Sequence, residues 1–241
     1  MSTAPKDARI PRSQAAGYVT SPSIRVIVGQ APDQKEFFVH EGLVCPRSEF
    51  FRKAMKGPWT EARERKIDLE QEDPETFALY LELLYTGALP TKEDTELYAP
   101  LSKLYVLAEM LMDDTTKTIV LDAIQAQIDD GPEKDHYCFP EPAAIRIIYK
   151  GTMESSPARE VMVKFYTDYS CGEELDELAD LNEFHYDLVR SLITKRPRPG
   201  EHDLVREELD DVKKELRDVR KELSSVKKEL AKKTEPRLYH C

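Results

Sequence analysis

The side chains that most often perform chemistry stand in isolation along this sequence. His136 and Cys138 could supply two metal ligands, but no matching pair lies near them. Glu173 and Glu174 belong to a solvated acidic run, whereas paired catalytic acids need burial to separate their pKa values. The nine glycines form no phosphate-binding loop, and the Gly-x-Ser-x-Gly and His-Glu-x-x-His motifs of hydrolases are absent. We therefore expect no enzyme activity, no cofactor and no metal site.

Composition points toward protein partners. The net charge of the 241 residues is −11, and from position 201 onward eleven basic residues balance eleven acidic ones, so the excess acid belongs to residues 1–200. Such acidity disfavours direct nucleic-acid binding. No apolar run approaches the ~20 residues that a membrane span needs, and no membrane segment is expected. The four cysteines are scattered without a CxxC motif, which predicts reduced thiols and an intracellular, cytoplasmic or nuclear location.

The elements that would position any binding surface are clearest in residues 23–89. Apolar residues alternate over 24–28 and 35–40, which predicts a β-hairpin with one buried face. Two short helices follow, the second capped by Ser48, and then come a strand at 66–69 and another helix. The expected connection around Trp59 is a polar loop. The order strand, strand, helix, helix, strand, helix predicts an α+β domain.

The rest of the chain divides at turn and charge signals. Residues 1–22 contain three prolines and few large apolar side chains, which is typical of disorder. Helical periodicity continues to about 195, interrupted by Gly and Pro after 129, and a basic Pro-rich run then suggests a linker. We thus predict a disordered tail at 1–22, an α+β domain at 23–128, a helical extension at 129–195, a linker at 196–203 and a coiled coil at 204–233.

A heptad seam marks the last of these segments. Its core positions are Leu209, Val212, Leu216, Val219, Leu223, Val226 and Leu230. Glutamates occupy one flank and basic residues the other, so parallel association pairs opposite charges whereas antiparallel association opposes like charges. Leucine at a with a β-branched residue at d favours more than two strands. The alternative is a single solvated helix with charge pairs along its own surface.

The first half of the chain resembles the BTB/POZ domain. The resemblance is carried by FFVH at 37–40, RSEFF at 47–51, DLEQEDPETF at 68–77, LYTG at 84–87 and LSKLYVLAEML at 101–111. The stretches GPWTEARERKIDL, IIYKGT and SPAREVMVKFY are similar to a branch common in filamentous fungi. The resemblance implies a hairpin and third strand packed with a cluster of helices, and a strand-end His40 whose buried imidazole bonds to backbone rather than acting in catalysis.

The same resemblance suggests two functions for a self-associating interaction scaffold. Many BTB domains are substrate adaptors of cullin-3 ubiquitin ligases and bind through a hydrophobic-x-Glu motif, for which Trp59-Thr60-Glu61 has the right place. Trp59 either covers the core or anchors a partner, and both readings stay open. The alternative is a transcriptional co-regulator, although Ser23 and Glu41 replace the acid and base of that branch's charged pocket and no zinc-finger spacing is present. The client protein is not indicated.

Overall fold

The computed structural model describes residues 17–91, 98–129, 140–170, 173–196 and 201–234. The chain separates into two compact units, Met1–Ser191 and Leu192–Cys241, which are described one at a time.

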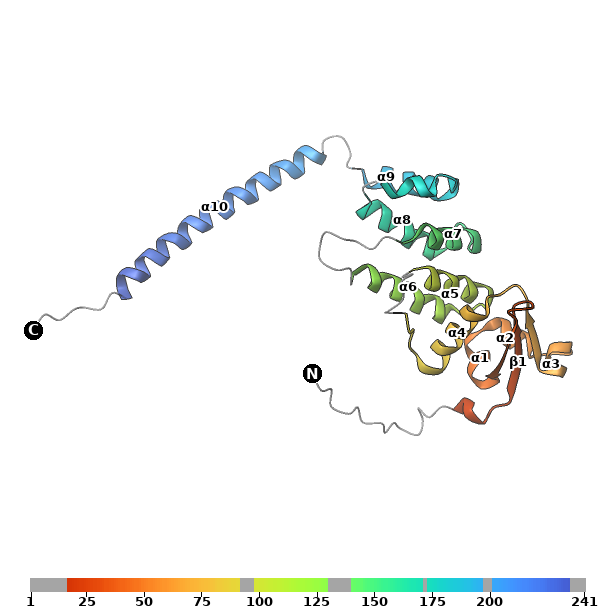
Figure 1. Ribbon diagram of the computed structural model, residues 1–241. Helices are drawn as coiled ribbons and strands as arrows, with labels where there is room; N and C mark the ends of the chain where they lie inside the picture. The colour runs from red at the N-terminus through yellow and green to blue at the C-terminus, as the bar shows by residue number, and fades with distance from the viewer. Residues whose placement is uncertain (1–16, 92–97, 130–139, 171–172, 197–200, 235–241) are drawn as a thin grey trace, which may run out of the picture. The chain divides into compact units, whose positions relative to one another are not determined.

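A three-stranded sheet lies at the start of the first unit (Figure 1). The order is β2-β1-β3; β1 runs antiparallel to β2, with Ile24 opposite Val39, and parallel to β3, with Val26 opposite Ile67. Alternate residues of β1 are fully buried because they face the helices, while Arg25 is exposed on the outer face. The strands are β1 (Ser23–Val28), β2 (Lys35–His40) and β3 (Lys66–Leu69).

Six helices accompany this sheet in the described part of the domain. They are α1 (Glu41–Arg47), α2 (Glu49–Ala54), α3 (Thr60–Glu64), α4 (Pro74–Thr86), α5 (Ala99–Met110) and α6 (Asp114–Asp129). α3 corrects the prediction made from the sequence, in which residues 60–64 belong to a loop. The helix has five residues and ends at Arg65 in the left-handed conformation, with φ of 53°. Such a short helix has too few positions to show a period, and the residue that follows it in the left-handed conformation is Arg65 instead of the usual glycine.

Ser48 joins the two short helices to the domain core. Its buried hydroxyl accepts a hydrogen bond from the Phe51 N–H at 3.2 Å, which caps α2, and donates to the Leu111 carbonyl at 2.6 Å. One side chain thus satisfies a helix terminus and links it to the end of α5.

We predict that Ser48→Ala lowers the free energy of unfolding by about 1–2 kcal/mol, because the Leu111 carbonyl loses its donor and α2 loses its cap. Urea unfolding of the full chain measures the change. Thr118→Ala is the matched control: the Thr118 hydroxyl bonds to the Asp114 carbonyl on the exposed side of α6, so a change of no more than about 0.5 kcal/mol is expected. Equal effects of the two substitutions would contradict the role given to Ser48.

A buried carboxylate ties three further elements together. Asp113 is fully buried, accepts the Thr116 N–H at 2.9 Å to cap α6, and receives the Tyr80 hydroxyl of α4 at 3.1 Å. Arg47 at the end of α1 lies at 3.4 Å from the same carboxylate. Burial, together with the neighbouring charge of Asp113, raises the pKa of Tyr80 above its usual value. The residue before α6 therefore also fixes α1 and α4.

Part of the segment expected to be disordered is ordered. Residues 1–16 lie outside the described part, but η2 (Gly17–Thr20) is a turn of 3₁₀ helix. The Tyr18 ring centroid lies 5.9 Å from those of His40 and Tyr85, and the Ser21 hydroxyl accepts the Gly42 N–H at 2.9 Å. Composition gave no sign of this docking, because the contacts come from two residues, Tyr18 and Ser21, in a segment with few large apolar side chains.

Further helices continue the first unit. They are α7 (Pro142–Gly151), α8 (Pro157–Tyr169), the 3₁₀ segment η3 (Glu173–Leu178) and α9 (Asn182–Lys195). α7 lies beside α5, and α8 contacts both α7 and α6 (Figure 1). Ile145 and Ile148 of α7 and Phe165 of α8 join the same buried core as the sheet. The extension thus shares one core with the domain.

In its described part, the second unit contains the last residues of α9 and one long helix, α10 (Glu201–Thr234). It begins inside the segment 196–203 that was predicted as linker, since Glu201 and Asp203 are favourable at a helix start. The side chains of Leu209, Val212, Leu216, Val219 and Leu223 are between 50% and 61% exposed. Those of Val226 and Leu230 lie outside the described residues. A row of exposed apolar residues at heptad spacing is what a coiled-coil helix presents before it meets its partners.

Candidate protein-interaction site

A surface pocket of about 370 Å³ lies where α2, α3 and β3 meet the end of α5. Its floor is largely apolar and its margin is charged. The lining residues are Phe50, Lys53, Ala54, Trp59, Glu61, Ile67, Asp68 and Met112. The structure therefore brings the two site residues predicted from sequence, Trp59 and Glu61, to one pocket, together with residues from distant segments of the chain.

Trp59 is an exposed aromatic residue rather than a cover over the core. It stands at the N-cap of α3, and 62% of its surface is accessible. Gly57 sits just before it with φ of 115°, a conformation that favours glycine, and a Cβ added there would lie 3.4 Å from the indole. Gly57 thus leaves room for the indole, which lines the pocket and is mostly open to solvent.

Glu61 lies in the first turn of α3, so its position is helical rather than in the loop expected from sequence. Its side chain is exposed. A carboxylate near a helix N-terminus is favoured by the helix dipole. The motif Trp59-Thr60-Glu61 is therefore presented by a helix start with fixed backbone geometry.

The pocket floor is held by the domain core. Ile67 of β3 is 2% exposed, and the Phe50 ring packs edge-on against Phe51 with centroids 5.5 Å apart. Met112 follows α5 in the left-handed conformation, with φ of 52°, and is 41% exposed. These residues offer apolar area on a rigid base.

The charged residues at the pocket margin already have weak partners. Lys53 pairs with Glu49 at 3.1 Å on α2, and Asp68 pairs with Lys66 at 2.9 Å on β3. Exposed pairs of this kind contribute little to stability and rearrange readily. They can therefore reorient toward the polar groups of a bound partner.

Arg65 places a positive charge next to Ser23 and Glu41. Its guanidinium bonds to the Glu41 carboxylate at 2.7 Å and donates from Nε to the Ser23 carbonyl at 3.0 Å. The basic group at this place is thus supplied from the end of α3. Sequence reasoning missed it because Arg65 is far from both partners along the chain.

The His40 ring is hydrogen-bonded to Tyr85, and the Cys45 side chain is a protonated thiol rather than a reactive thiolate. The His40 Nδ1 lies 2.8 Å from the Tyr85 hydroxyl, which also accepts the His40 N–H at 3.2 Å. The half-buried imidazole therefore bonds to a side chain, not to backbone as expected. Burial, and secondly the charge of Glu41, raises the pKa of Cys45 to about 11. Its thiol is protonated at neutral pH.

Metal-binding clusters and membrane-spanning helices were both considered from the sequence. Among the described residues no group of three or more His, Cys, Asp or Glu side chains could hold a metal ion, and none of their helices is long and apolar enough to cross a membrane. His136 and Cys138 lie outside the described residues, as do the side chains of Glu173 and Glu174.

Part of the chain matches a known protein family. Residues 24–125 match the BTB/POZ domain. Similar solved structures include the BTB domain of zebrafish PATZ1, with 17% identity, a TM-score of 0.32 and coverage of 42% of this chain and 75% of that one. Another is the BTB domain of human Gigaxonin, with 18% identity, a TM-score of 0.31 and coverage of 41% and 74%. No curated protein matches the chain.

Proposed function

Because residues 24–125 form a BTB/POZ domain, we propose that this chain is a protein–protein interaction scaffold that acts by binding rather than by catalysis. BTB domains are interaction modules that associate with themselves and with partners. The observation that carries the proposal is the pocket of about 370 Å³ with an exposed indole and an exposed carboxylate at its margin. Aromatic residues beside an apolar depression are the usual anchors of protein interfaces. The client protein and the compartment, cytoplasm or nucleus, are left open.

The partner that we propose for the pocket is cullin-3. The hydrophobic-x-Glu motif of BTB adaptors corresponds to Trp59-Thr60-Glu61, which α3 presents with both functional side chains accessible. The apolar floor from Phe50, Ile67 and Met112 suits a side chain of an amphipathic partner helix. Glu61 would then accept a hydrogen bond from that helix.

Calorimetric titration of the full chain with the amino-terminal domain of cullin-3 tests this role directly. We expect saturable binding with one site per BTB domain. The absence of any heat of binding at high micromolar concentration would reject the adaptor role and leave the scaffold proposal in place.

A transcriptional co-regulator acting through BTB contacts is the second candidate. It is favoured by one observation. The resemblance expects a charged pocket with an acid at position 23 and a base at position 41, where this chain has Ser23 and Glu41. Arg65 supplies a base at this place, because it pairs with Glu41 and bonds to the Ser23 carbonyl. Fusing the chain to a DNA-binding domain tests this candidate. Repression of a reporter that is lost in Arg65→Glu would support it, and an unaffected reporter would count against it.

We predict that α10 associates on its own. A peptide of residues 201–235 should be helical and should melt at a temperature that rises with concentration, because association buries its exposed Leu and Val seam. Sedimentation equilibrium gives the mass. Replacing Leu216 and Leu223 by lysine should yield a monomer with little helix. A wild-type peptide that is monomeric at high micromolar concentration would contradict the coiled coil.

The BTB part should associate independently of α10. We predict that a chain ending at residue 200 remains a dimer in light scattering, since it keeps all the residues that match the BTB/POZ domain, 24–125. A monomeric mass for this truncated chain would assign all self-association to α10.

A further inference from the structure

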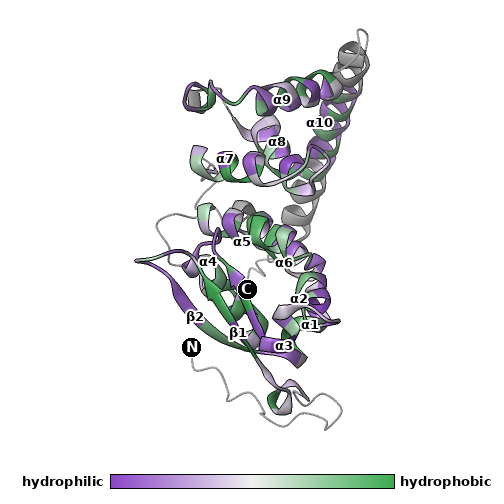
Figure 2. Cartoon of the chain, turned by 90° about the vertical axis from the view of Figure 1, so that its right-hand side faces the viewer, coloured by the Kyte–Doolittle hydropathy of each residue, from purple (hydrophilic) through white to green (hydrophobic). Residues whose placement is uncertain are grey.

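β2 forms one margin of the sheet (Figure 2) and, within the described residues, pairs only with β1. The Glu41 N–H donates to the Pro22 carbonyl at 2.9 Å. Because hydrogen-bonded pairs recur at every second residue of an antiparallel ladder, the backbones of Phe37 and Val39 face β1. The backbone N–H and C=O groups of Glu36, Phe38 and His40 therefore face the open edge.

Tyr85 closes this edge at one end. Its hydroxyl accepts the His40 N–H at 3.2 Å and bonds to the His40 ring, against which Tyr18 also packs. Nothing in the described part of the chain bonds to the outward backbone groups of Glu36 and Phe38. Two residues thus present a short template for another strand.

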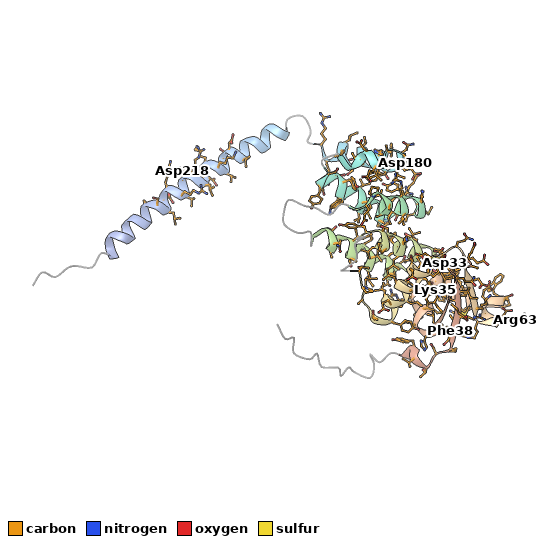
Figure 3. All side chains as sticks on the ribbon, viewed as in Figure 1. Asp33, Lys35, Phe38, Arg63, Asp180 and Asp218 are labelled. Carbon is orange, nitrogen blue, oxygen red and sulfur yellow. The ribbon has the colours of Figure 1, made fainter. Side chains whose placement is uncertain are left out.

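The outer face next to this template is apolar at its centre. Phe38, labelled in Figure 3, is 67% exposed and lies opposite Arg25 in the register. Arg25 forms an ion pair with Glu36 on the same face. Exposed edge strands are usually protected by charges or proline, but here a phenylalanine stands beside free backbone groups.

We propose that β2 pairs antiparallel with β2 of a second copy of this chain across a two-fold axis, so that one sheet continues through both copies. This inference rests on the proposed self-association and specifies a surface for it. Glu36 lies opposite Phe38 of the second copy, and Phe37 lies opposite its own equivalent. Every open N–H and C=O group of Glu36 and Phe38 is then paired, while the His40–Tyr85 contacts remain in place.

The charges and sterics favour this register over its neighbours. On the outer face, Phe38 lies between Arg25 of its own copy and Glu36 of the other, so opposite charges flank the ring and their aliphatic stems cover it. If Glu36 lay opposite its own equivalent, two carboxylates would face each other across the two-fold axis. If Phe38 lay opposite its own equivalent, the second strand would run into the Tyr85 hydroxyl. In the two-fold arrangement the same edge is used on both copies, so the pairing is complete with two copies and leaves no β2 edge open for a third.

Proline at position 38 tests the edge in the full chain. Phe38→Pro removes an N–H that faces away from β1, a place where edge strands tolerate proline, and should leave the intramolecular ladder intact. Phe38→Thr is the matched control, because it keeps the N–H and a strong strand preference. All chains in this comparison, including the one called wild type, carry Leu216→Lys and Leu223→Lys, so that α10 does not hold the copies together. In sedimentation equilibrium, the wild type should then reach about twice the mass of Phe38→Pro. Phe38→Thr should reach the wild-type mass with roughly tenfold weaker association.

The results separate this surface from self-association in general. Equal masses of an oligomeric wild type and a folded Phe38→Pro, judged by equal melting temperatures, would overturn the edge proposal alone. A monomeric wild type, with α10 prevented from associating, would overturn the self-association of the BTB/POZ domain as well. An edge covered by another segment of the same chain would leave the mass unchanged in both variants and would also overturn the proposal.

Cross-linking gives a readout that does not need the proline variant to fold. Directly opposed residues in a hydrogen-bonded pair have Cα atoms about 5.5 Å apart, which a disulfide can span. Mixing Glu36→Cys and Phe38→Cys copies and oxidising them should give a peptide joined between 36 and 38, identified by mass spectrometry. Each variant alone should give much less self-linked product at its own position. The absence of a 36–38 product in the mixture would overturn the proposal.

Discussion

The double substitution Trp59→Ala with Glu61→Lys is expected to weaken cullin-3 binding by roughly 3–6 kcal/mol. The first change removes the exposed indole that would anchor the partner next to the apolar floor. The second places a positive charge where a carboxylate would accept a charge-assisted hydrogen bond. Calorimetry with the amino-terminal domain of cullin-3 measures the loss.

The fold should tolerate this double change. Trp59 is 62% exposed and Glu61 lies on the exposed first turn of a five-residue helix, so the free energy of unfolding should change by less than about 1 kcal/mol. The matched control is Met153→Ala with Glu154→Lys, which alters another exposed apolar residue and an adjacent exposed acid in the same unit. The control should bind like the wild type.

Two outcomes would contradict the pocket assignment. Full binding by the double variant would mean that cullin-3 contacts a different surface. Loss of binding together with loss of the thermal transition would mean that the indole supports the fold, despite its exposure, and that the apparent docking role is structural.

Sequence patterns were sufficient for the elements that have a period and a cap. Alternation in β1 identified its buried face, and Ser48 marked the start of α2 where its hydroxyl caps the helix. The match of residues 24–125 confirms the predicted α+β BTB/POZ fold. α3 could not be found, because five residues show no helical period and Arg65 ends it without glycine. The fungal branch, coiled-coil association and the cullin-3 role remain predictions.

The pocket could be predicted only in part. Trp59 and Glu61 stand together in a short motif, so sequence reasoning could select them. Phe50, Ile67 and Met112 lie on separate segments, and only the packing of α2, β3 and the end of α5 brings them together. The same limit applies to Arg65 and to the open edge of β2, which depend on strand order and register rather than on local spacing.

A buried arginine holds the helical extension together. Arg159 of α8 is 5% exposed, and its guanidinium donates to the carbonyls of Tyr149 at 2.7 Å and Thr152 at 2.6 Å. It also pairs with Glu183 of α9 at 2.7 Å and lies 4.4 Å from the centroid of the Tyr149 ring. One side chain thus satisfies the end of α7 and connects it to α8 and α9. A planar group with several donors suits this task better than a lysine.

We expect Arg159→Ala to reduce the free energy of unfolding by about 2–4 kcal/mol, because two carbonyls at the end of α7 lose their donor and a packed side chain is removed. Arg159→Lys should recover only a minor part of this loss, since a single ammonium cannot reach all four partners. Lys164→Ala, at an exposed position of the same helix, should have an effect below about 0.5 kcal/mol. Urea unfolding measures the change in the free energy of unfolding for each variant. Hydrogen exchange of the α7, α8 and α9 backbone amides shows where protection is lost. If Arg159→Lys were as stable as the wild type, charge alone would account for the contact, and the geometric role of the guanidinium would be wrong.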